Sequence, residues 1–368
     1  MYQGKSLSGE DEEAFQGVLN PLFSALEMLR FIARHFHPPQ FEELMVSVGS
    51  PDVELRLALT NQSTWPAHLA DAGRKLEQAG KAVLETFDCL RQILEEGGDA
   101  RSIQRALRRV PDALQTLYPL ATMLPQVNWF FIDPPLRSDG RLQQRFLDAP
   151  PADCIGVMQF DADGKERGGF WLYVPETYVP DHAWPVVMAL HGGSGTGRLF
   201  LWSWLRDARS KDTILVAPTA VGNTWALTGV DPDTPNLKRI LEFVRSKWNV
   251  DATRLLLTGM SDGGTFCYVS GLDAGSPFTH LAPVAAAFHP MLGEMADPDR
   301  LHGLPIHIVH GALDWVFPIE LARQARDILS RKGAEVSYRE FDDLSHTYPG
   351  EVNADLLRWM DATPSARR

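Results

Sequence analysis

The chain has 368 residues, of which 44% are apolar and 22% are charged, and it carries a formal charge of −12. This apolar fraction excludes a wholly disordered chain, and the length predicts two domains or one large one. Nucleic acid is excluded as the main partner, because binding a phosphate backbone requires a clustered surface of lysine and arginine. No stretch approaches the roughly 18 consecutive apolar residues of a membrane span.

The cysteine content bears on the compartment. Only 3 cysteines occur, and they lie far apart in the sequence: Cys89, Cys154 and Cys267. An odd number of widely separated cysteines predicts neither a disulfide framework nor a metal site. The opening sequence MYQGKSLSGEDEEAF turns acidic without an apolar core, unlike a secretory signal. We therefore expect a cytoplasmic protein.

Before about residue 150, apolar residues recur at the spacing of helices. The pattern predicts three long helices, at 15–37, 66–96 and 100–124. Pro38-Pro39 ends the first of these helices and Gly97-Gly98 ends the second. Residues 1–150 are therefore predicted to form an all-helical N-terminal domain.

After Pro150-Pro151, short buried strands alternate with helical stretches. The strands are predicted at 154–160, 169–174, 185–190, 213–217, 254–258, 281–286, 306–309 and 336–341. The first two flank the turn 161–164 and predict a hairpin. Helices are predicted at 234–248, 263–270, 319–331 and 351–360. This alternation predicts a second domain, residues 151–368, with a mainly parallel sheet and helices on both of its faces.

The strongest chemical signal is the G-x-S-x-G pattern of Gly259-Met260-Ser261-Asp262-Gly263, which lies between a predicted strand and a predicted helix. A serine on such a tight turn has strained backbone angles, and small neighbours prevent clashes where the chain folds back. The start of the helix offers N–H groups to developing negative charge. A serine in a glycine-rich turn is often structural, but the strand before it and the helix after it favour a nucleophile.

A glycine-rich loop, His191-Gly192-Gly193-Ser194-Gly195, follows another predicted strand. Such a loop can bring a backbone N–H close to an oxyanion, and the donor would be that of Gly193 or Ser194, paired with the N–H of Asp262. The alternative is a turn that only reverses the chain. A phosphate-binding loop is excluded, because Arg198-Leu199 stand where Lys and Ser or Thr are required.

A serine hydroxyl needs a neighbouring base, and the chain has 11 histidines. His346 is the predicted base, because it lies between the last predicted strand and the last predicted helix. Loops in that position gather at the carboxyl end of a parallel sheet, where ligand sites form. His310 is its main competitor but lies within a predicted strand, and His191 is expected to support its own loop.

A carboxylate should orient the imidazole, and Asp314 follows the penultimate predicted strand. Its alternative role is to cap the helix that begins near Pro318. Asp342 and Asp343 also compete, but they are nearly adjacent to His346 along the chain, which makes the geometry awkward.

Residues from about 152 to 362 resemble the α/β-hydrolase superfamily and, within it, the esterase group that includes feruloyl esterases and polyhydroxybutyrate-depolymerase-like enzymes. The nucleophile, acid and base loops above occur in the chain order of that superfamily. The other segments that carry the resemblance are Leu190-His191-Gly192-Gly193, Gly222-Asn223-Thr224-Trp225 and Trp248-Asn249-Val250-Asp251, which leads to Arg254. Depolymerases of this type are usually exported and contain disulfides, and this chain departs from them in its cysteines.

The resemblance implies an α/β-hydrolase fold with Ser261 as nucleophile, His346 as general base and acid, and Asp314 as the orienting acid. It also implies an oxyanion hole at Gly193 and Asp262. The predicted substrate contacts are Ser194, Trp225 and Trp315. An acidic residue directly after the nucleophile would disfavour anionic groups nearby if its side chain faces the pocket.

We expect a serine carboxylesterase that acts on a small-molecule ester through an acyl-enzyme, with no metal and no organic cofactor. The same machinery serves peptidases, thioesterases and acyl-transferases, which stay open. A noncatalytic binding protein of this fold is a further alternative, although such proteins usually have a broken triad.

Three roles are open to the N-terminal helices. One is a lid over the cleft, to which the segment 123–133 would contribute apolar walls. Another is that Trp129, Phe130 and Phe131 are ordinary core where the two parts of the chain meet. The third is a surface through which the chain forms a homo-oligomer.

Overall fold

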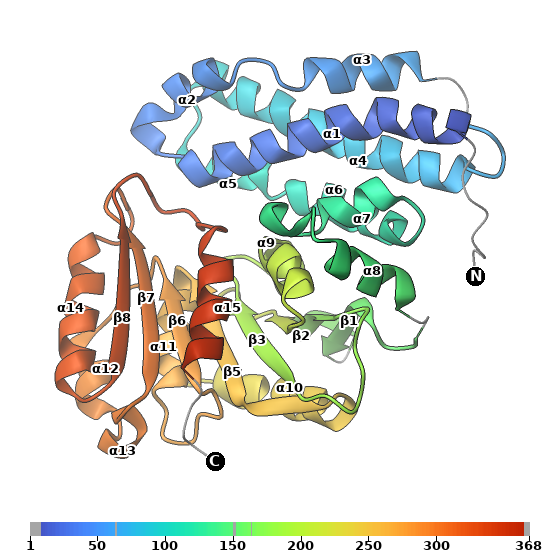
Figure 1. Ribbon diagram of the computed structural model, residues 1–368. Coiled ribbons are helices and arrows are strands. Elements are labelled where there is room, and N and C mark those ends of the chain that lie inside the picture. The colour runs from blue at the N-terminus through green and yellow to red at the C-terminus, as the bar shows by residue number, and fades with distance from the viewer. Residues whose placement is uncertain (1–8, 63–64, 150–151, 163, 364–368) are drawn as a thin grey trace. The chain divides into compact units, whose positions relative to one another are not determined.

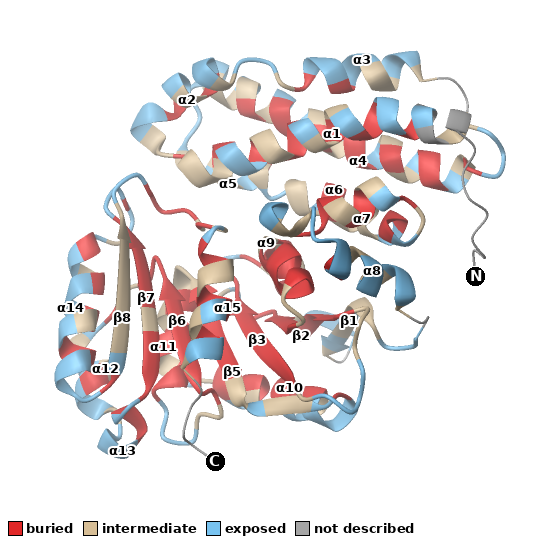
Figure 2. Ribbon diagram, viewed as in Figure 1, coloured by how far each residue is buried: buried red, intermediate tan, exposed pale blue. Residues whose placement is uncertain are grey.

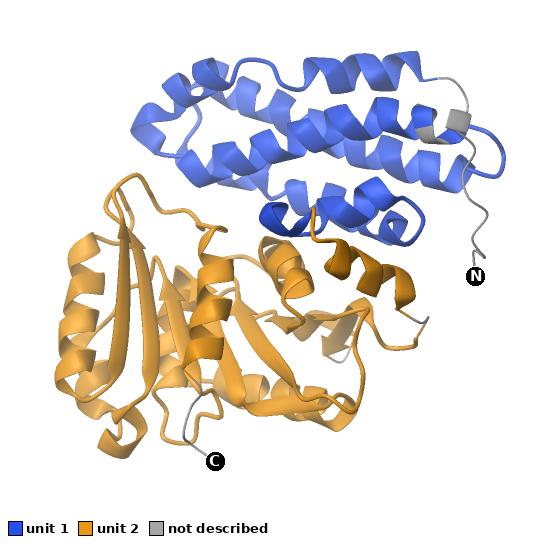
Figure 3. Ribbon diagram, in the orientation of Figure 1, with its two compact units in different colours: residues 1–137 blue, residues 138–368 orange. Residues whose placement is uncertain are grey.

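The structure, a computed structural model, describes residues 9–62, 65–149, 152–162 and 164–363, and the chain divides into two compact units (Figure 3). Unit 1 ends at Arg137 and unit 2 begins at Ser138. The predicted boundary, between residues 150 and 151, falls on residues outside the described ranges.

Helix α8 (Gly140–Asp148) groups with unit 2, although the sequence places it in the helical domain. Arg145 forms an ion pair with Asp212, with 2.8 Å between Nη2 and Oδ1. The guanidinium of Arg209 lies over the ring of Phe146, 4.1 Å from its centroid. These contacts tie α8 to the residues around strand β4 of unit 2.

Unit 1 is helical throughout its described part, as predicted. Its α-helices are α1 (Gly9–His35), α2 (Phe41–Val48), α3 (Val53–Asn61), α4 (Ala70–Glu96), α5 (Ala100–Leu107), α6 (Val110–Leu117) and α7 (Pro125–Phe130). Helices α1, α3 and α4 pack against one another, and α4 also packs against α5 and α6 (Figure 1). Figure 2 shows that buried residues alternate with exposed ones along these helices, as on amphipathic helices that share a core.

The third predicted helix is broken into two helices and a 3-10 turn at Tyr118–Thr122. Pro111 lies in the first turn of α6 and has no N–H to continue the hydrogen bonding of α5. Pro119 acts in the same way at the start of the 3-10 turn. The apolar periodicity continues through both breaks, which is why spacing alone predicts one helix.

The aromatic residues at the end of α7 belong to the core of unit 1. Phe130 stacks on Phe23, with 4.3 Å between ring centroids, and meets Phe131 edge to face. Phe131 in turn packs edge to face with Tyr118. Both phenylalanines therefore have partners within their own unit, and this packing accounts for their burial.

Unit 2 is built on an eight-stranded sheet in the order β1-β2-β4-β3-β5-β6-β7-β8. Its strands are β1 (Gly156–Ala162), β2 (Lys165–Val174), β3 (Trp184–Leu190), β4 (Ile214–Pro218), β5 (Val250–Met260), β6 (His280–Val284), β7 (Pro305–Gly311) and β8 (Glu335–Phe341). Strand β2 is antiparallel to β1 and to β4, and strands β3 to β8 are parallel to one another. All eight predicted strands and the predicted hairpin are present. Asp163 of its turn lies outside the described residues.

Helices cover both faces of this sheet (Figure 1). The helices of unit 2 besides α8 are α9 (Gly197–Ser210), α10 (Asp233–Lys247), α11 (Asp262–Gly271), α12 (Pro290–Met295), α13 (Pro298–Leu301), α14 (Ile319–Arg331) and α15 (Val352–Ala362). Helices α9 and α15 contact each other on one face, whereas α11 and α14 pack on the other. The central strands β3 and β4 are buried along their whole length, as expected of parallel strands between two helical layers.

The strand order, together with the turn from β5 into α11, defines the α/β-hydrolase fold, and the predicted fold class is confirmed. In β3 and β5, Leu190 pairs with Gly259, and in β5 and β6, Met260 pairs with Val284. The loops that leave the carboxyl ends of these strands are therefore neighbours. The same edge carries the loops after β7 and β8, because those strands are parallel to them.

Candidate active site

Ser261 lies on the turn between β5 and α11, where its backbone has φ 57° and ψ −120°. A residue other than glycine rarely adopts a positive φ, and such strain persists only where the surroundings impose it. The N–H of Ser261 donates to the carbonyl of Val284 at 3.0 Å, which ties the turn to the end of β6. A Cβ at Gly263 would lie 2.5 Å from the carbonyl oxygens of Leu190 and His191, so the turn requires glycine there.

The structure brings together the three residues that the sequence selects from separate loops. Nε2 of His346 lies 2.9 Å from Oγ of Ser261. Nδ1 of the same ring lies 2.8 Å from Oδ2 of Asp314 and 3.0 Å from its Oδ1. Because a carboxylate only accepts, Nδ1 carries the hydrogen and Nε2 is left to accept the proton of the serine hydroxyl.

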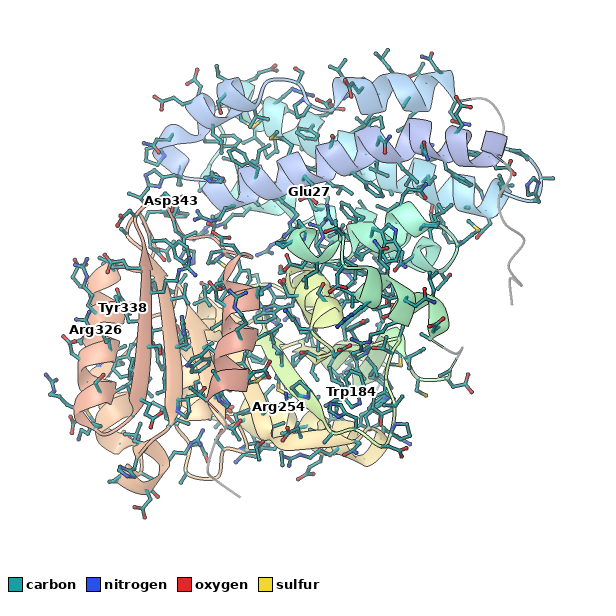
Figure 4. The ribbon with its side chains drawn as sticks, in the orientation of Figure 1. Glu27, Trp184, Arg254, Arg326, Tyr338 and Asp343 are labelled. Carbon is teal, nitrogen blue, oxygen red and sulfur yellow. The ribbon has the colours of Figure 1, made fainter. Side chains whose placement is uncertain are left out.

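Asp314 is held by its own loop. Its Oδ1 accepts the N–H groups of Val316 at 2.9 Å and of Phe317 at 2.8 Å, and its side chain is fully buried. These bonds resemble a helix cap, the alternative role expected from sequence, so one carboxylate closes its turn and also contacts His346. The competing Asp342 and Asp343 are exposed on the loop after β8, and Figure 4 labels Asp343 there.

The loop after β3 lies beside the serine turn. A Cβ at Gly192 would lie 3.6 Å from Cβ of Ser261, and one at Gly193 would lie 2.8 Å from Oδ2 of Asp262. The structure therefore places Gly193 next to the side chain of Asp262, and the oxyanion hole at their N–H groups stays a prediction. Ser194 is exposed on this loop and has φ 56°.

The side chain of Asp262 contacts a third loop, the one after β4. Oγ1 of Thr224 donates to Oδ2 of Asp262 at 2.6 Å. The same carboxylate oxygen occupies the space that a side chain at position 193 would need. Asp262 thus connects the loops after β3, β4 and β5. Thr224 belongs to the segment Gly222-Asn223-Thr224-Trp225 that carries the resemblance, but sequence reasoning did not predict this contact.

Trp225 lies in the core, contrary to its prediction as a substrate contact. Its side chain is only 2% exposed and stacks on Phe266, with 5.3 Å between ring centroids. Its indole N–H donates to the carbonyl of His191 at 2.7 Å. Nε2 of His191 in turn accepts the N–H of Ala220 at 3.1 Å. The side chains of Trp225 and His191 therefore stabilise the glycine-rich loop through these hydrogen bonds.

Trp315 is 43% exposed and lies beside His346, with 6.3 Å between the ring centroids. Phe317 meets the same imidazole edge to face at 5.4 Å. Leu313 and Val316 of this loop are also exposed. The rings of Trp315 and Phe317 therefore lie beside His346, and the role of Trp315 as a substrate contact stays a prediction.

Among the described residues, no three His, Cys, Asp or Glu side chains gather as a metal site would require. In that part of the chain there is also no helix of the length and apolarity that crossing a bilayer demands.

These features place the chain among proteins of the α/β-hydrolase fold with a serine, histidine and aspartate at one edge of the sheet. No family model matches the chain. The bifunctional acetylxylan esterase/xylanase XynS20E of Neocallimastix patriciarum is 25% identical over 200 residues, which are 51% of this chain and 27% of that protein. The chain thus spans about a quarter of this curated relative. The similarity agrees with the resemblance to serine esterases that the sequence motifs predict.

Solved structures with similar chains also include esterases. A thermostable esterase is 21% identical with a TM-score of 0.47, covering 56% of this chain and 62% of its own. The esterase PE8 is 19% identical with a TM-score of 0.42, covering 52% and 97%. A truncated carbohydrate esterase from gut microbiota is 13% identical with a TM-score of 0.48, covering 59% and 99%.

Proposed function

We propose that this protein is a serine carboxylesterase that hydrolyses carboxylic esters through an acyl-enzyme on Ser261. The observation that carries the proposal is the row of hydrogen bonds from Ser261 through His346 to Asp314. A nucleophile in contact with a base, and a base oriented by a carboxylate, are the parts that acyl transfer requires. The similarity to a relative named as an acetylxylan esterase supports an ester as the substrate.

In the first step, Oγ of Ser261 attacks the ester carbonyl while Nε2 of His346 takes the hydroxyl proton. The carbonyl carbon becomes tetrahedral, and its oxyanion is stabilised by the N–H groups of Gly193 and Asp262. Loss of one such donor typically costs about 10²–10³ in rate. The bond to the leaving oxygen then breaks, His346 returns the proton to the alcohol, and Asp314 stabilises the imidazolium between these two transfers.

In the second step, a water molecule attacks the acyl-enzyme. His346 takes its proton, and the acid is released as the proton returns to Oγ of Ser261. No step needs a metal or an organic cofactor, because His346 transfers the proton and backbone N–H groups stabilise the negative charge of the oxyanion. The exposed apolar side chains beside His346 favour an apolar group on the leaving alcohol, since His346 hands its proton to that oxygen.

The test is turnover of p-nitrophenyl esters with acyl chains of two to eight carbons by the full chain and by Ser261→Ala. We expect hydrolysis by the wild type and a loss of at least about 10³-fold in the variant. A fluorophosphonate should label the wild type with one equivalent at Ser261 and leave the variant unlabelled. Equal turnover by both proteins would refute the proposal, and labelling without ester turnover would point to another acyl substrate.

We propose a reducing, cytoplasmic setting, because all three cysteines are free and Cys154 is exposed. The proposed roles of unit 1 are a lid, a homo-oligomer interface and structural support. The lid is tested by the dependence of kcat/KM on acyl length in variants of exposed apolar residues of unit 1, of which Phe31 and Leu57 are examples. Sedimentation of the full chain tests the homo-oligomer interface, and an unchanged profile in a monomeric chain leaves structural support.

A further inference from the structure

Two histidines contact the carboxylate of Asp314, and only one of them contacts the serine. His310 is the penultimate residue of β7, and it is fully buried. Its Nε2 lies 3.3 Å from Oδ2 of Asp314, the same oxygen that lies 2.8 Å from Nδ1 of His346. Asp314 therefore lies within reach of one ring nitrogen from each histidine.

The surroundings of His310 determine which nitrogen carries its hydrogen. Nε2 lies 2.8 Å from the carbonyl oxygen of Phe317, which can only accept, so Nε2 is the donor. Nδ1 is buried and has no partner among the described residues. Burial lowers the pKa of His310 below its ordinary value, which favours the neutral ring.

This N–H acts on Asp314 in two ways. It donates to the carbonyl of Phe317, and the N–H of Phe317 donates to Oδ1 of Asp314 at 2.8 Å. His310 therefore stabilises the turn that binds the Asp314 carboxylate. Its Nε2 also lies 3.3 Å from Oδ2 of Asp314, close enough for the partial positive charge of the N–H to stabilise the carboxylate without a hydrogen bond to it.

We propose that His310 is a positioning residue, which orients Asp314 and so sets the basicity of His346 without touching the substrate. The inference rests on the proposed function, because it assigns His310 to the same reaction. The charged or titratable groups near His310 are Asp314, His346 and Glu340, its partner in the register of β7 and β8. Arg323 of α14 pairs with Glu340, whereas the carboxylate of Asp314 lies 3.3 Å from Nε2 of His310.

A matched pair of variants separates this role from simple filling of space. His310→Gln keeps an N–H at about the position of Nε2, and His310→Met has nearly the same shape without a donor. We expect kcat/KM of the Met variant to fall about tenfold to hundredfold, the range for a buried acceptor, here the carbonyl of Phe317, that is left without its donor. The Gln variant should recover at least about tenfold of that loss.

The pH profile provides a readout that packing does not affect. With one donor fewer, the Asp314 carboxylate holds a proton on His346 more strongly, so the acid limb of kcat/KM should move to higher pH in the Met variant. In an Asp314→Asn background the same substitution should have little further effect on kcat/KM. Equal losses in the Gln and Met variants with an unmoved acid limb, or additive losses in the double variant, would overturn the proposal.

A measurement on the wild-type chain covers the case in which the Met variant does not fold. Nitrogen-15 chemical shifts of the imidazoles should show the neutral His310 ring with its hydrogen on Nε2, and a pKa below the ordinary value of 6.5. A hydrogen on Nδ1 of the neutral ring, or a pKa above 6.5, would refute the proposal. This result does not depend on ester turnover, so failure of the carboxylesterase assignment is recognised separately by the Ser261→Ala comparison.

Discussion

Gly311, the last residue of β7, allows the loop that carries His346 to lie directly against the strand. A Cβ at this position would lie 2.1 Å from the carbonyl oxygen of Leu344 and 2.8 Å from its Cβ. The backbone of Gly311 does not have a positive φ, so alanine fits its conformation and only the space is missing. Gly311→Ala therefore tests the packing between these two loops and nothing else.

The required movement follows from these distances. A carbon and a carbonyl oxygen normally approach no closer than roughly 3.2 Å, so the strand end and the loop must separate by about 1 Å. His346 lies two residues beyond Leu344, and its contacts to Ser261 and Asp314 are 2.9 and 2.8 Å long. A separation of 1 Å breaks at least one of them, and a displacement of that size costs about 10²-fold in rate. We expect a loss of unfolding free energy of about 1–3 kcal/mol as well.

The assay is kcat/KM on p-nitrophenyl acetate together with the urea dependence of unfolding. Gly140→Ala is the matched control, because a Cβ there meets nothing within 4 Å and the same chemical change is made in the same unit. We expect the control to keep wild-type activity and stability. A Gly311→Ala protein with wild-type kcat/KM would show that the loop after β8 does not rest on β7 as described.

Three other predictions concern the site and its pH dependence. Asp314→Asn should lower kcat by about 10⁴-fold with little change in KM, and a loss below tenfold would contradict the role of Asp314. Trp315→Ala should raise KM for esters of bulky apolar alcohols more than for methyl esters, whereas Leu147→Ala, an exposed apolar control on α8, should change neither. Burial lowers the pKa of His280 and of His307 below their ordinary value of 6.5. The unfolded chain then binds more protons than the folded one below about pH 6.5, so Tm should fall as the pH drops from 7 toward 5. Replacing both histidines with Gln should flatten this decline, and an unchanged slope would contradict it.

The fold and the three residues of the candidate site could be predicted because their signals are local. The strands of unit 2 are short apolar runs between turn residues, and Ser261 lies in a five-residue pattern whose glycines are needed where the turn meets β3. Asp314 and His346 could be selected because each follows a strand, and parallel strands bring such loops to one edge of the sheet. Chain order thus carries three-dimensional information in this fold.

The other features depend on contacts between residues far apart in the sequence. Tryptophan is a residue type that often contacts ligands, and Trp225 is predicted to do so. Its indole N–H instead donates to the carbonyl of His191 and its ring stacks on Phe266, so it lies in the core. The grouping of α8 with unit 2 rests on its pairing with Asp212, which no local pattern encodes.

From sequence, His310 is predicted to lie in a strand and is the main alternative to His346 as the base. The sequence by itself determined the fold class and the three residues at the site, because strand periodicity and turn chemistry act over a few neighbouring residues. Only the tertiary structure decided that His310 contacts Asp314 and that Asp262 joins three loops, because hydrogen bonds form between whichever groups the packed loops bring within about 3 Å.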